Sequence, residues 1–337
     1  MYGTRTLPKR LIYLSDSASA HNLRFISLLE QDFSVTTAYL NETKAVEIFE
    51  EMDKNTFNYL VYSPISLDII EFLQKTNLKR IGICLAYEFN ELSKEINIRE
   101  RIAVNLENTE TLICDSRYIA QGIKELYGYD KTSIVARYGC DLDIFVTPPE
   151  IEPKELRILV TRNWTTIHGN EIILQALKEL DNRGIKFVAN FVKWNNSSQL
   201  DYSIPKFNYG QLNLLNYLES DELRSRLEDN WLYISAATSD GSSVSMLEAL
   251  ANGNIVLVSD FITNVEIIED GENGFVFENK SAAGLVSKIL QIMEYEPDKL
   301  KQVSVEARKT AQKMGNWKHE SRIILNGINS ELETEGQ

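Results

Sequence analysis

The residues best suited to chemistry in this chain lie between Trp231 and Asp260. Here an apolar run ends in the small-residue turn Ser239-Asp240-Gly241-Ser242-Ser243, and a helical pattern begins at Val244. Gly241 lets the backbone approach a ligand closely, and Ser242 or Ser243 is suited to cap the helix. Free N–H groups at the start of a helix attract anions. The segment therefore favours binding of a phosphate or diphosphate.

Glu248 is the single charged residue inside the helix that this turn opens. The residues around it are apolar: Val244, Met246, Leu247, Ala249, Leu250 and Ala251. A carboxylate on so apolar a helix is costly to bury unless a partner satisfies it. The hydroxyl groups of a ribose would serve, and so would a Lys or Arg of the protein itself. Spacing alone leaves both alternatives open.

The composition is that of a globular protein with two domains: 337 residues, 43% hydrophobic and 25% charged. The net charge is −14 and both halves are acidic, so no basic half is set aside for nucleic acid. The three cysteines are odd in number and widely spaced, which fits reduced thiols in the cytosol. No Cys/His spacing indicates a metal site, and none is expected.

No apolar run approaches the ~18 residues that a membrane span requires. The beginning of the chain, from Met1 to Arg5, lacks the long apolar stretch of a secretory signal. We therefore expect a cytoplasmic protein, with peripheral contact to the inner face of the membrane as a compatible arrangement.

Apolar runs alternate with amphipathic stretches almost throughout, which is typical of parallel sheets covered by helices. The expected strands are 10–14, 59–62, 80–85, 111–114 and 133–136 in the first half, and 156–160, 187–192, 232–236 and 255–258 in the second. The expected helices are 21–30, 43–52, 169–182, 244–252, 282–294, 299–313 and 317–332. The fold class is therefore α/β, with two doubly wound Rossmann-like domains and a cleft between them.

Three prolines between Phe145 and Lys154 mark the break between the two series of strands. Proline is excluded from helix interiors and central strands, so this stretch is the expected linker. The predicted domains are an N-terminal one at 1–148 and a C-terminal one at 155–316. The final segment, 317–337, is expected to be a helix that packs back toward the N-terminal domain.

The region from Asp240 to Gly274 resembles the signature of family 4 retaining glycosyltransferases, which have the GT-B fold and belong to the glycosyl transferases group 1. In that signature an acidic residue, seven intervening residues and a Glu lead into Ala-x-Ala-x-Gly. A hydrophobic strand, a turn with Glu and Asp-Gly-x-Asn-Gly follow. This chain has Asp240, Glu248, Ala249, Ala251, Gly253, Ile255–Ser259, Glu266, Asp270, Gly271, Asn273 and Gly274 in that order.

The resemblance implies a role for each donor-site residue. Glu248 would bind the ribose of a nucleotide-sugar, and Asp240 would contact its sugar. The backbone N–H groups of Ser243 and Val244, with the adjoining Gly241 and Ser242, would meet the diphosphate. The family usually has Glu where this chain has Asp240, whose side chain is one methylene shorter.

A second segment, Leu159–Gly169, resembles the strand end where the family clamps the diphosphate with Arg and, six residues on, commonly Lys. Arg162 fits, and its planar fork suits phosphate oxygens. The resemblance favours this role over a surface ion pair. His168 stands where Lys is usual, so a donor contact and mere packing both remain open for it. Arg162 and Asp240 are the expected catalytic residues, and no nucleophile is assigned.

The acceptor-side residues are expected in the first half of the chain. The loop after the first strand resembles the family's Asp-x-x-Ser-x-His-x-x-Arg-aromatic version, and two further residues follow the strand at 80–85. These candidates are Asp16, Ser19, His21, Arg24, Tyr87 and Glu88. As alternatives, Asp16 or Ser19 caps the helix and His21 is an ordinary helix residue.

The resemblance implies an enzyme that moves a sugar from a nucleoside diphosphate to an acceptor hydroxyl, like a hexosyltransferase and without a metal. A UDP-sugar is favoured over a GDP-sugar as donor, with no tightly bound cofactor, and base contacts are expected within 207–219. Glycan, lipid-linked and protein acceptors are all compatible, in glycan or surface polysaccharide synthesis, as is association with a partner protein. The alternatives are a nucleotide-sugar epimerase and a noncatalytic partner subunit of an active transferase.

Overall fold

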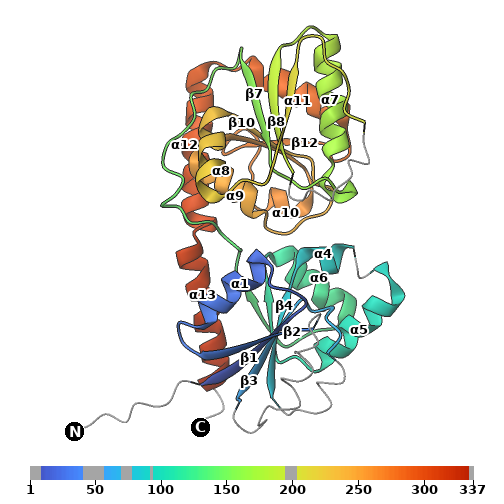
Figure 1. Ribbon diagram of the computed structural model, residues 1–337, viewed down its shortest axis with the longest axis vertical. Helices are drawn as coiled ribbons and strands as arrows, with labels where there is room; N and C mark the ends of the chain where they lie inside the picture. Colours follow the sequence, from blue (N-terminus) through green and yellow to red (C-terminus); the bar gives the residue numbers. More distant parts are fainter. Residues whose placement is uncertain (1–8, 41–56, 70–77, 92–93, 194–202, 334–337) are drawn as a thin grey trace, which may run out of the picture. The chain divides into compact units, whose positions relative to one another are not determined.

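The computed structural model describes residues 9–40, 57–69, 78–91, 94–193 and 203–333 (Figure 1). The chain divides into two compact units. The first comprises Met1–Ala136 and Ser321–Gln337, and the second comprises Arg137–Glu320. The proline-rich stretch at 145–154 therefore lies within the second unit. The helix predicted at 43–52 lies outside the described residues.

The first unit is a parallel six-stranded sheet with the strand order β2-β1-β3-β4-β5-β6. Its strands are β1 (Arg10–Ser15), β2 (Ser34–Tyr39), β3 (Tyr59–Ser63), β4 (Lys79–Cys84), β5 (Thr111–Cys114) and β6 (Thr132–Val135). Its helices are α1 (Ala20–Leu29), α4 (Ala86–Asn90), α5 (Ile96–Glu107) and α6 (Arg117–Tyr127). Buried Leu, Ile and Tyr side chains from the central strands and from α5 and α6 form its core.

The second unit is also a parallel six-stranded sheet, with the order β12-β11-β10-β7-β8-β9. Its strands are β7 (Leu156–Val160), β8 (Phe187–Val192), β9 (Gln211–Leu215), β10 (Leu232–Ser235), β11 (Ile255–Ser259) and β12 (Phe275–Phe277). Its helices are α7 (Asn170–Asn182), α8 (Ser220–Asp229), α9 (Val244–Asn252), α10 (Ile262–Val265), α11 (Ala282–Met293) and α12 (Pro297–Met314), preceded by a 3₁₀ turn at Thr166–His168.

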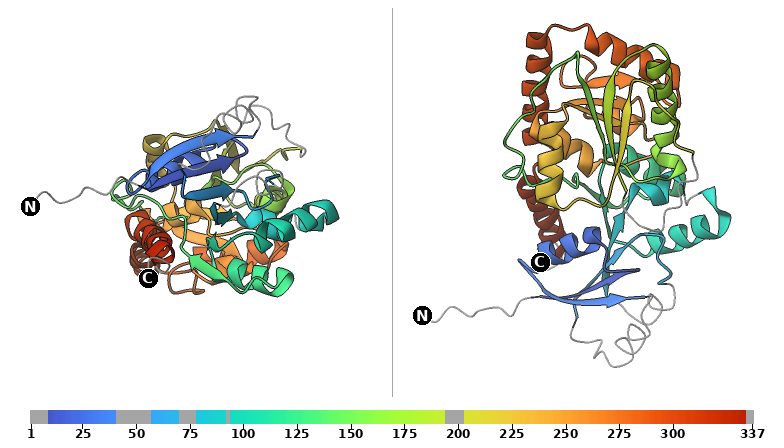
Figure 2. Two further views of the ribbon diagram at one scale, coloured as in Figure 1. Left: turned by 90° about the horizontal axis from the view of Figure 1, so that it is seen from below. Right: turned by 45° about the horizontal axis from the view of Figure 1, so that its top comes forward.

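Alternation along the strands divides the core of the second unit between the two faces of its sheet. On β10, Leu232 and Ile234 pack into one apolar cluster with residues of α7 and α11. Tyr233, which points the other way, packs into a second cluster with residues of α9. Helices thus cover both faces (Figures 1 and 2). Such a sheet leaves its carboxyl edge open for ligands.

The last helix, α13 (Trp317–Glu333), begins in the second unit and continues into the first, because the boundary between the units lies after Glu320. Its later part makes polar contacts with the first unit. Thr132 donates to the Glu331 carboxylate at 2.9 Å, and Asn329 donates to Asp32 at 2.8 Å. Ile324 and Ile328 of the same part are fully buried.

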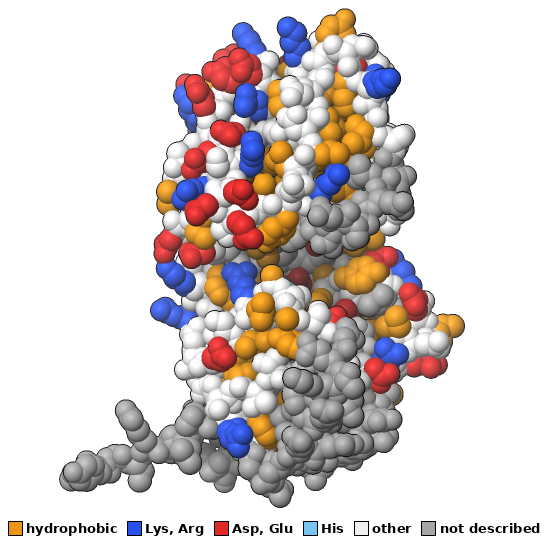
Figure 3. All heavy atoms as spheres, in the orientation of Figure 1, with side chains coloured by type: hydrophobic (Ala, Val, Ile, Leu, Met, Phe, Trp, Pro, Cys, Tyr) orange, Lys and Arg blue, Asp and Glu red, His pale blue; other side chains and the backbone are white. Residues whose placement is uncertain are grey.

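All nine expected strands are present, and their bounds differ from the expected ones by at most one residue at either end. The strands β2, β9 and β12 were not expected, and all three lie at sheet edges. None of the helices in the described part of the chain is both long and apolar enough to cross a membrane. On the face shown in Figure 3, acidic and basic side chains of the second unit are interspersed rather than gathered into a basic patch.

Candidate functional site

The turn between β10 and α9 is built as the sequence predicts, at the carboxyl edge of the second sheet. Of the two serines suited to cap α9, it is Ser243 that does so, because its hydroxyl accepts the Met246 N–H at 3.4 Å. The turn is fixed to the loop after β7, where the Ile167 carbonyl accepts the Thr238 N–H at 2.7 Å. A Cβ atom at Gly169 would lie 2.1 Å from the Ala236 carbonyl oxygen, so only glycine fits this contact.

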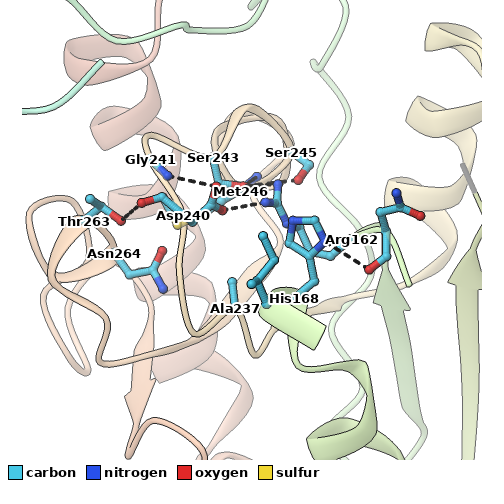
Figure 4. A network of polar contacts seen from close by, with 12 residues as sticks. Arg162, His168, Ala237, Asp240, Gly241, Ser243, Ser245, Met246, Thr263 and Asn264 are labelled. Carbon is cyan, nitrogen blue, oxygen red and sulfur yellow. Dashed lines mark hydrogen bonds and ion pairs between the residues drawn. The ribbon is translucent and has the colours of Figure 1, made fainter. Parts of the chain in front are cut away.

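Arg162 leaves the end of β7 and reaches the start of α9 (Figure 4). One terminal nitrogen of its guanidinium lies 2.7 Å from a carboxylate oxygen of Asp240. The other donates to the Ser243 hydroxyl at 3.1 Å. Two residues predicted for the donor site, Asp240 and Ser243, therefore hold Arg162 in place. Each terminal nitrogen carries a second hydrogen, and the planar guanidinium fixes the direction in which that hydrogen points.

Asp240 is half-buried, and its neighbours have opposite effects on the pKa of its carboxyl group. Burial raises the pKa of its carboxyl group, while the nearby Arg162 guanidinium and the Gly241 N–H lower it. That N–H donates to a carboxylate oxygen of Asp240 at 2.9 Å, and Thr263 donates to its backbone carbonyl at 3.3 Å. The Gly241 amide, expected to face a phosphate, thus serves the Asp240 side chain in this structure.

His168 ends the 3₁₀ turn and lies beside Arg162 (Figure 4). Its Nδ1 atom is 2.8 Å from the Thr165 hydroxyl and 3.1 Å from the Asn163 carbonyl oxygen. Burial, followed by the charge of Arg162, lowers the pKa of His168 to about 3. The imidazole is therefore neutral at physiological pH and does not replace the charge of a lysine.

Hydroxyl groups that the sequence did not single out extend the site into the core. Ser245 lies 3.3 Å from the Ser243 hydroxyl and 3.0 Å from that of Tyr233. Thr161 donates to Tyr233 at 3.2 Å. Tyr233 lies within an apolar strand and Ser245 within an apolar helix, so neither carried a signal beyond its polarity.

The remaining donor-site candidates are distributed along the turn and the first two turns of α9. Ser242 is buried. Val244 and Glu248 are half-buried, whereas the residues between them are buried. A spacing of four residues places Val244 and Glu248 on one face of the helix. Glu248 thus lies on the exposed side of α9 rather than within its apolar interior.

The region expected to contact the base, 207–219, has three parts. Asp181 fixes the first part, because its buried carboxylate accepts the N–H groups of Asn208, Tyr209 and Gly210 at 2.7–3.1 Å. The second part is β9, which ends at Leu215. Residues 216–219 follow the carboxyl end of that strand, which is the edge where Arg162 leaves β7.

The acceptor-side candidates after β1 surround the start of α1 in the first unit. Ser19 caps this helix and accepts the Asn22 N–H at 3.2 Å, as the alternative interpretation holds. Asp16 is exposed and accepts a hydrogen bond from Ser17 at 3.0 Å. His21 and Arg24 are half-buried. Burial, with a smaller effect of Arg24, lowers the pKa of His21 to about 4.

The two candidates after β4 differ in exposure. Tyr87 is half exposed at the start of α4. Glu88 is 1% exposed, and its carboxylate oxygens accept the N–H groups of Ser66 and Leu85 at 2.6 and 2.8 Å. The expectation that Glu88 faces the acceptor is therefore corrected. Both of its carboxylate oxygens accept hydrogen bonds from the backbone, and one of these bonds supports the loop after β3.

Among the residues that the structure describes, no group of three or more His, Cys, Asp or Glu side chains is placed to hold a metal ion. The three cysteines are buried thiols.

Residues 146–310 match the family described as glycosyl transferases group 1. The search of curated proteins found no match. Among solved structures, a sucrose-phosphate synthase from Thermosynechococcus elongatus is similar at a TM-score of 0.75 and 12% identity, over 96% of this chain and 99% of that one.

Two further structures are similar to this chain over nearly the whole length of both proteins. HepE from Anabaena, in complex with UDP, has a TM-score of 0.73 at 12% identity, over 95% of this chain and 100% of its own. A glycosyltransferase from Rickettsia africae ESF-5 has a TM-score of 0.68 at 15% identity, over 98% and 100%. Identities this low show the fold, which is GT-B. The family match adds that residues 146–310 are similar to the glycosyl transferases group 1.

Proposed function

We propose that this protein is a retaining glycosyltransferase that moves a sugar from a UDP-sugar to an acceptor hydroxyl. The observation that carries this proposal is the position of Arg162. Its guanidinium lies at the amino end of α9, held by Asp240 and Ser243. A fixed cation beside free helix amides is the arrangement that a diphosphate requires. The family of residues 146–310 supports the same reading.

The leaving group of such a reaction is a nucleoside diphosphate, so catalysis depends on stabilising the charge that develops on it. Arg162 and the first-turn amides of α9 would do so from fixed positions. Each such donor contributes about 3–4 kcal/mol to lowering a barrier of this kind. Asp240 is proposed to contact the sugar and Glu248 the ribose. His168, being neutral, would contribute a hydrogen bond at most.

The donor is proposed to carry uridine. HepE, a structural neighbour, has been solved with UDP, with UDP and glucose, and with UDP-glucose. In this chain residues 216–219 follow the carboxyl end of β9, and they are the proposed base contacts. The reaction is proposed to need neither a metal ion nor a bound cofactor, because Arg162 and the helix amides supply the charge stabilisation.

The acceptor is proposed to bind the N-terminal unit, through the carboxyl edge of its sheet. Asp16, His21, Arg24 and Tyr87 are the candidates, while Ser19 and Glu88 support the local backbone. A glycan, a lipid-linked glycan or a protein fits this role. We place the enzyme in the cytoplasm, with association to the membrane surface or a partner protein as part of the proposal, in glycan or surface polysaccharide synthesis.

One observation favours a second candidate, a noncatalytic partner that binds a nucleotide-sugar without turning it over. The usual lysine is His168 here, and its lowered pKa of about 3 leaves the site with one cation fewer than the family pattern. Such a partner would bind UDP-glucose but release no UDP from it in the presence of any acceptor.

The test begins with a thermal-shift series of the full chain with UDP, GDP and ADP and with their sugar conjugates, because a ligand of the folded state raises the melting temperature. We expect UDP compounds to give the largest shift. Transfer to a panel of glycans and lipid-linked glycans then identifies the acceptor, and the configuration of the new bond tests retention.

Arg162→Ala is the decisive variant, with Arg183→Ala as its matched control. Arg183 also pairs with a carboxylate, that of Glu179 at 2.9 Å, but at the exposed far end of α7. Arg162→Ala should lower transfer about a hundredfold or more. Equal transfer rates for the two variants would show that the diphosphate clamp is wrongly assigned.

A further inference from the structure

A chain of buried hydroxyl groups connects Arg162 to the core of the second unit. It starts at Ser243, passes through Ser245 at 3.3 Å, and reaches Tyr233 at 3.0 Å. Ser243 and Ser245 are 3% and 8% exposed, and Tyr233 is fully buried. The three residues come from β10 and from the start of α9. The chain therefore joins the two elements that flank the turn of the donor site.

The hydrogen bonds of Ser243 determine which way its hydroxyl donates within this network of hydroxyl groups. Its hydroxyl oxygen accepts from the Arg162 guanidinium at 3.1 Å and from the Met246 N–H at 3.4 Å. A serine hydroxyl has two acceptor positions and one hydrogen. With both acceptor positions used, that hydrogen is free to point to Ser245. Ser245 thus keeps the Ser243 oxygen turned toward Arg162.

Tyr233 fixes the far end of the chain. Its hydroxyl lies 3.0 Å from that of Ser245 and accepts from Thr161 at 3.2 Å. Burial raises the pKa of Tyr233, so the phenol stays neutral and keeps its hydrogen. Thr161 directly precedes Arg162, at the end of β7. The network therefore supports Arg162 both through its own backbone and through Ser243.

We propose that Tyr233 and Ser245 are positioning residues for the donor diphosphate, which they orient by fixing Ser243 as an acceptor for Arg162. The inference rests on the function proposed above. An arginine side chain has several rotatable bonds, and holding it in one geometry costs entropy that a ligand must otherwise supply. Asp240 fixes one terminal nitrogen, and the hydroxyl chain fixes the other. The guanidinium hydrogens that Asp240 and Ser243 do not use are then held in position to donate to phosphate oxygens.

The test measures UDP affinity of the full chain by calorimetry for Tyr233→Phe and Ser245→Ala. Each variant removes one hydroxyl and leaves the charge of the site unchanged. We expect UDP to bind roughly tenfold more weakly to either variant, since each loses one hydrogen bond that supports a charged group. Because both act through one chain, the double variant should lose no more than either single one. Ser245→Thr, which keeps the hydroxyl, should bind UDP like the wild type.

A matched control is Tyr62→Phe. Tyr62 is also fully buried, and its hydroxyl lies 2.7 Å from that of Thr109, but it belongs to β3 of the first unit. This variant loses a buried tyrosine hydroxyl without touching the donor site. Its UDP affinity should equal that of the wild type.

A second measurement separates positioning from a general loss of structure. In an Arg162→Lys background the fork is absent, so Tyr233→Phe should have no further effect on UDP affinity. An equal loss in both backgrounds would mean a structural role and overturn the inference. So would a wild-type affinity for both Tyr233→Phe and Ser245→Ala, although the proposed function would then stand. A wild-type chain that binds none of UDP, GDP or ADP would instead overturn the proposed function together with the inference.

Discussion

The guanidinium of Arg162 and the carboxylate of Asp240 form an ion pair of 2.7 Å in which both side chains are 16% exposed. The one arginine predicted to clamp the donor diphosphate is thus already engaged by an anion. The pair has two opposed effects on a donor. The carboxylate orients the guanidinium, and it also repels the phosphate charges that the guanidinium attracts.

Asp240→Asn separates these two effects. The variant keeps the shape of the side chain and removes its charge, so UDP should bind about fivefold more tightly because the repulsion is lost. Transfer should nevertheless fall, since Asp240 is proposed to contact the sugar. Calorimetry with UDP and a transfer assay measure the two effects. Asp240→Glu, which keeps the charge, serves as control, and a weaker affinity of Asp240→Asn for UDP would show that orientation outweighs repulsion.

His168→Lys tests the missing second cation. Burial and Arg162 hold the pKa of His168 near 3, so the wild-type imidazole carries no charge between pH 5 and 8. A lysine there should tighten the binding of UDP-glucose about tenfold at low ionic strength, and the gain should shrink in high salt. His168→Gln, which stays neutral, should match the wild type. A gain that is insensitive to salt, or no gain, would argue that position 168 does not face the diphosphate.

Glu248 is tested by pairing a protein change with a ligand change. If its carboxylate accepts hydrogen bonds from the ribose, the wild type should bind UDP about tenfold more tightly than 2′,3′-dideoxy-UDP. Glu248→Ala should bind both ligands equally weakly, because neither gains from the hydroxyls. Calorimetry of the four combinations gives the coupling directly. A variant that still prefers UDP by the wild-type factor would place the ribose elsewhere.

The sequence predicted the interior of both sheets better than their edges. The central strands, such as β10 and β11, are buried on both faces and appear as apolar runs. The strands that were not expected, β2, β9 and β12, lie at edges. Ser34–Tyr39 and Gln211–Leu215 are mostly half-buried and therefore mix polar with apolar residues. Phe275–Phe277 is too short to form a pattern.

The candidate site shows a similar division between features that the sequence predicts and features that it does not. A local feature, the serine cap of α9, follows from residue types within a few positions. Contacts across the fold do not. Arg162 and Asp240 are far apart in sequence, and nothing in either segment predicts their ion pair. Glu88 was expected at the acceptor, but it is buried. Its burial depends on the loop around Ser66, and nothing in the sequence connects that loop to Glu88.

Glu88 should make the stability of the first unit depend on pH. Burial is the main reason why its pKa rises to about 7 from the usual 4.5, although hydrogen bonds from backbone N–H groups oppose the rise. A carboxyl group with a raised pKa binds its proton more tightly in the folded state. Its contribution to stability is therefore fully present below about pH 4.5 and is lost as the pH rises to about 7, by about 3 kcal/mol in total.

Glu88→Gln removes this titration and also one of the two acceptors for the N–H groups of Ser66 and Leu85. The variant should be less stable than the wild type at pH 5, and the difference should shrink toward pH 8. All four tryptophans lie in the second unit, so fluorescence does not follow the first. Amide hydrogen exchange of β3 and β4 does. Glu91→Gln, at the end of the same helix, is the control, and an equal pH response of both variants would refute the assignment.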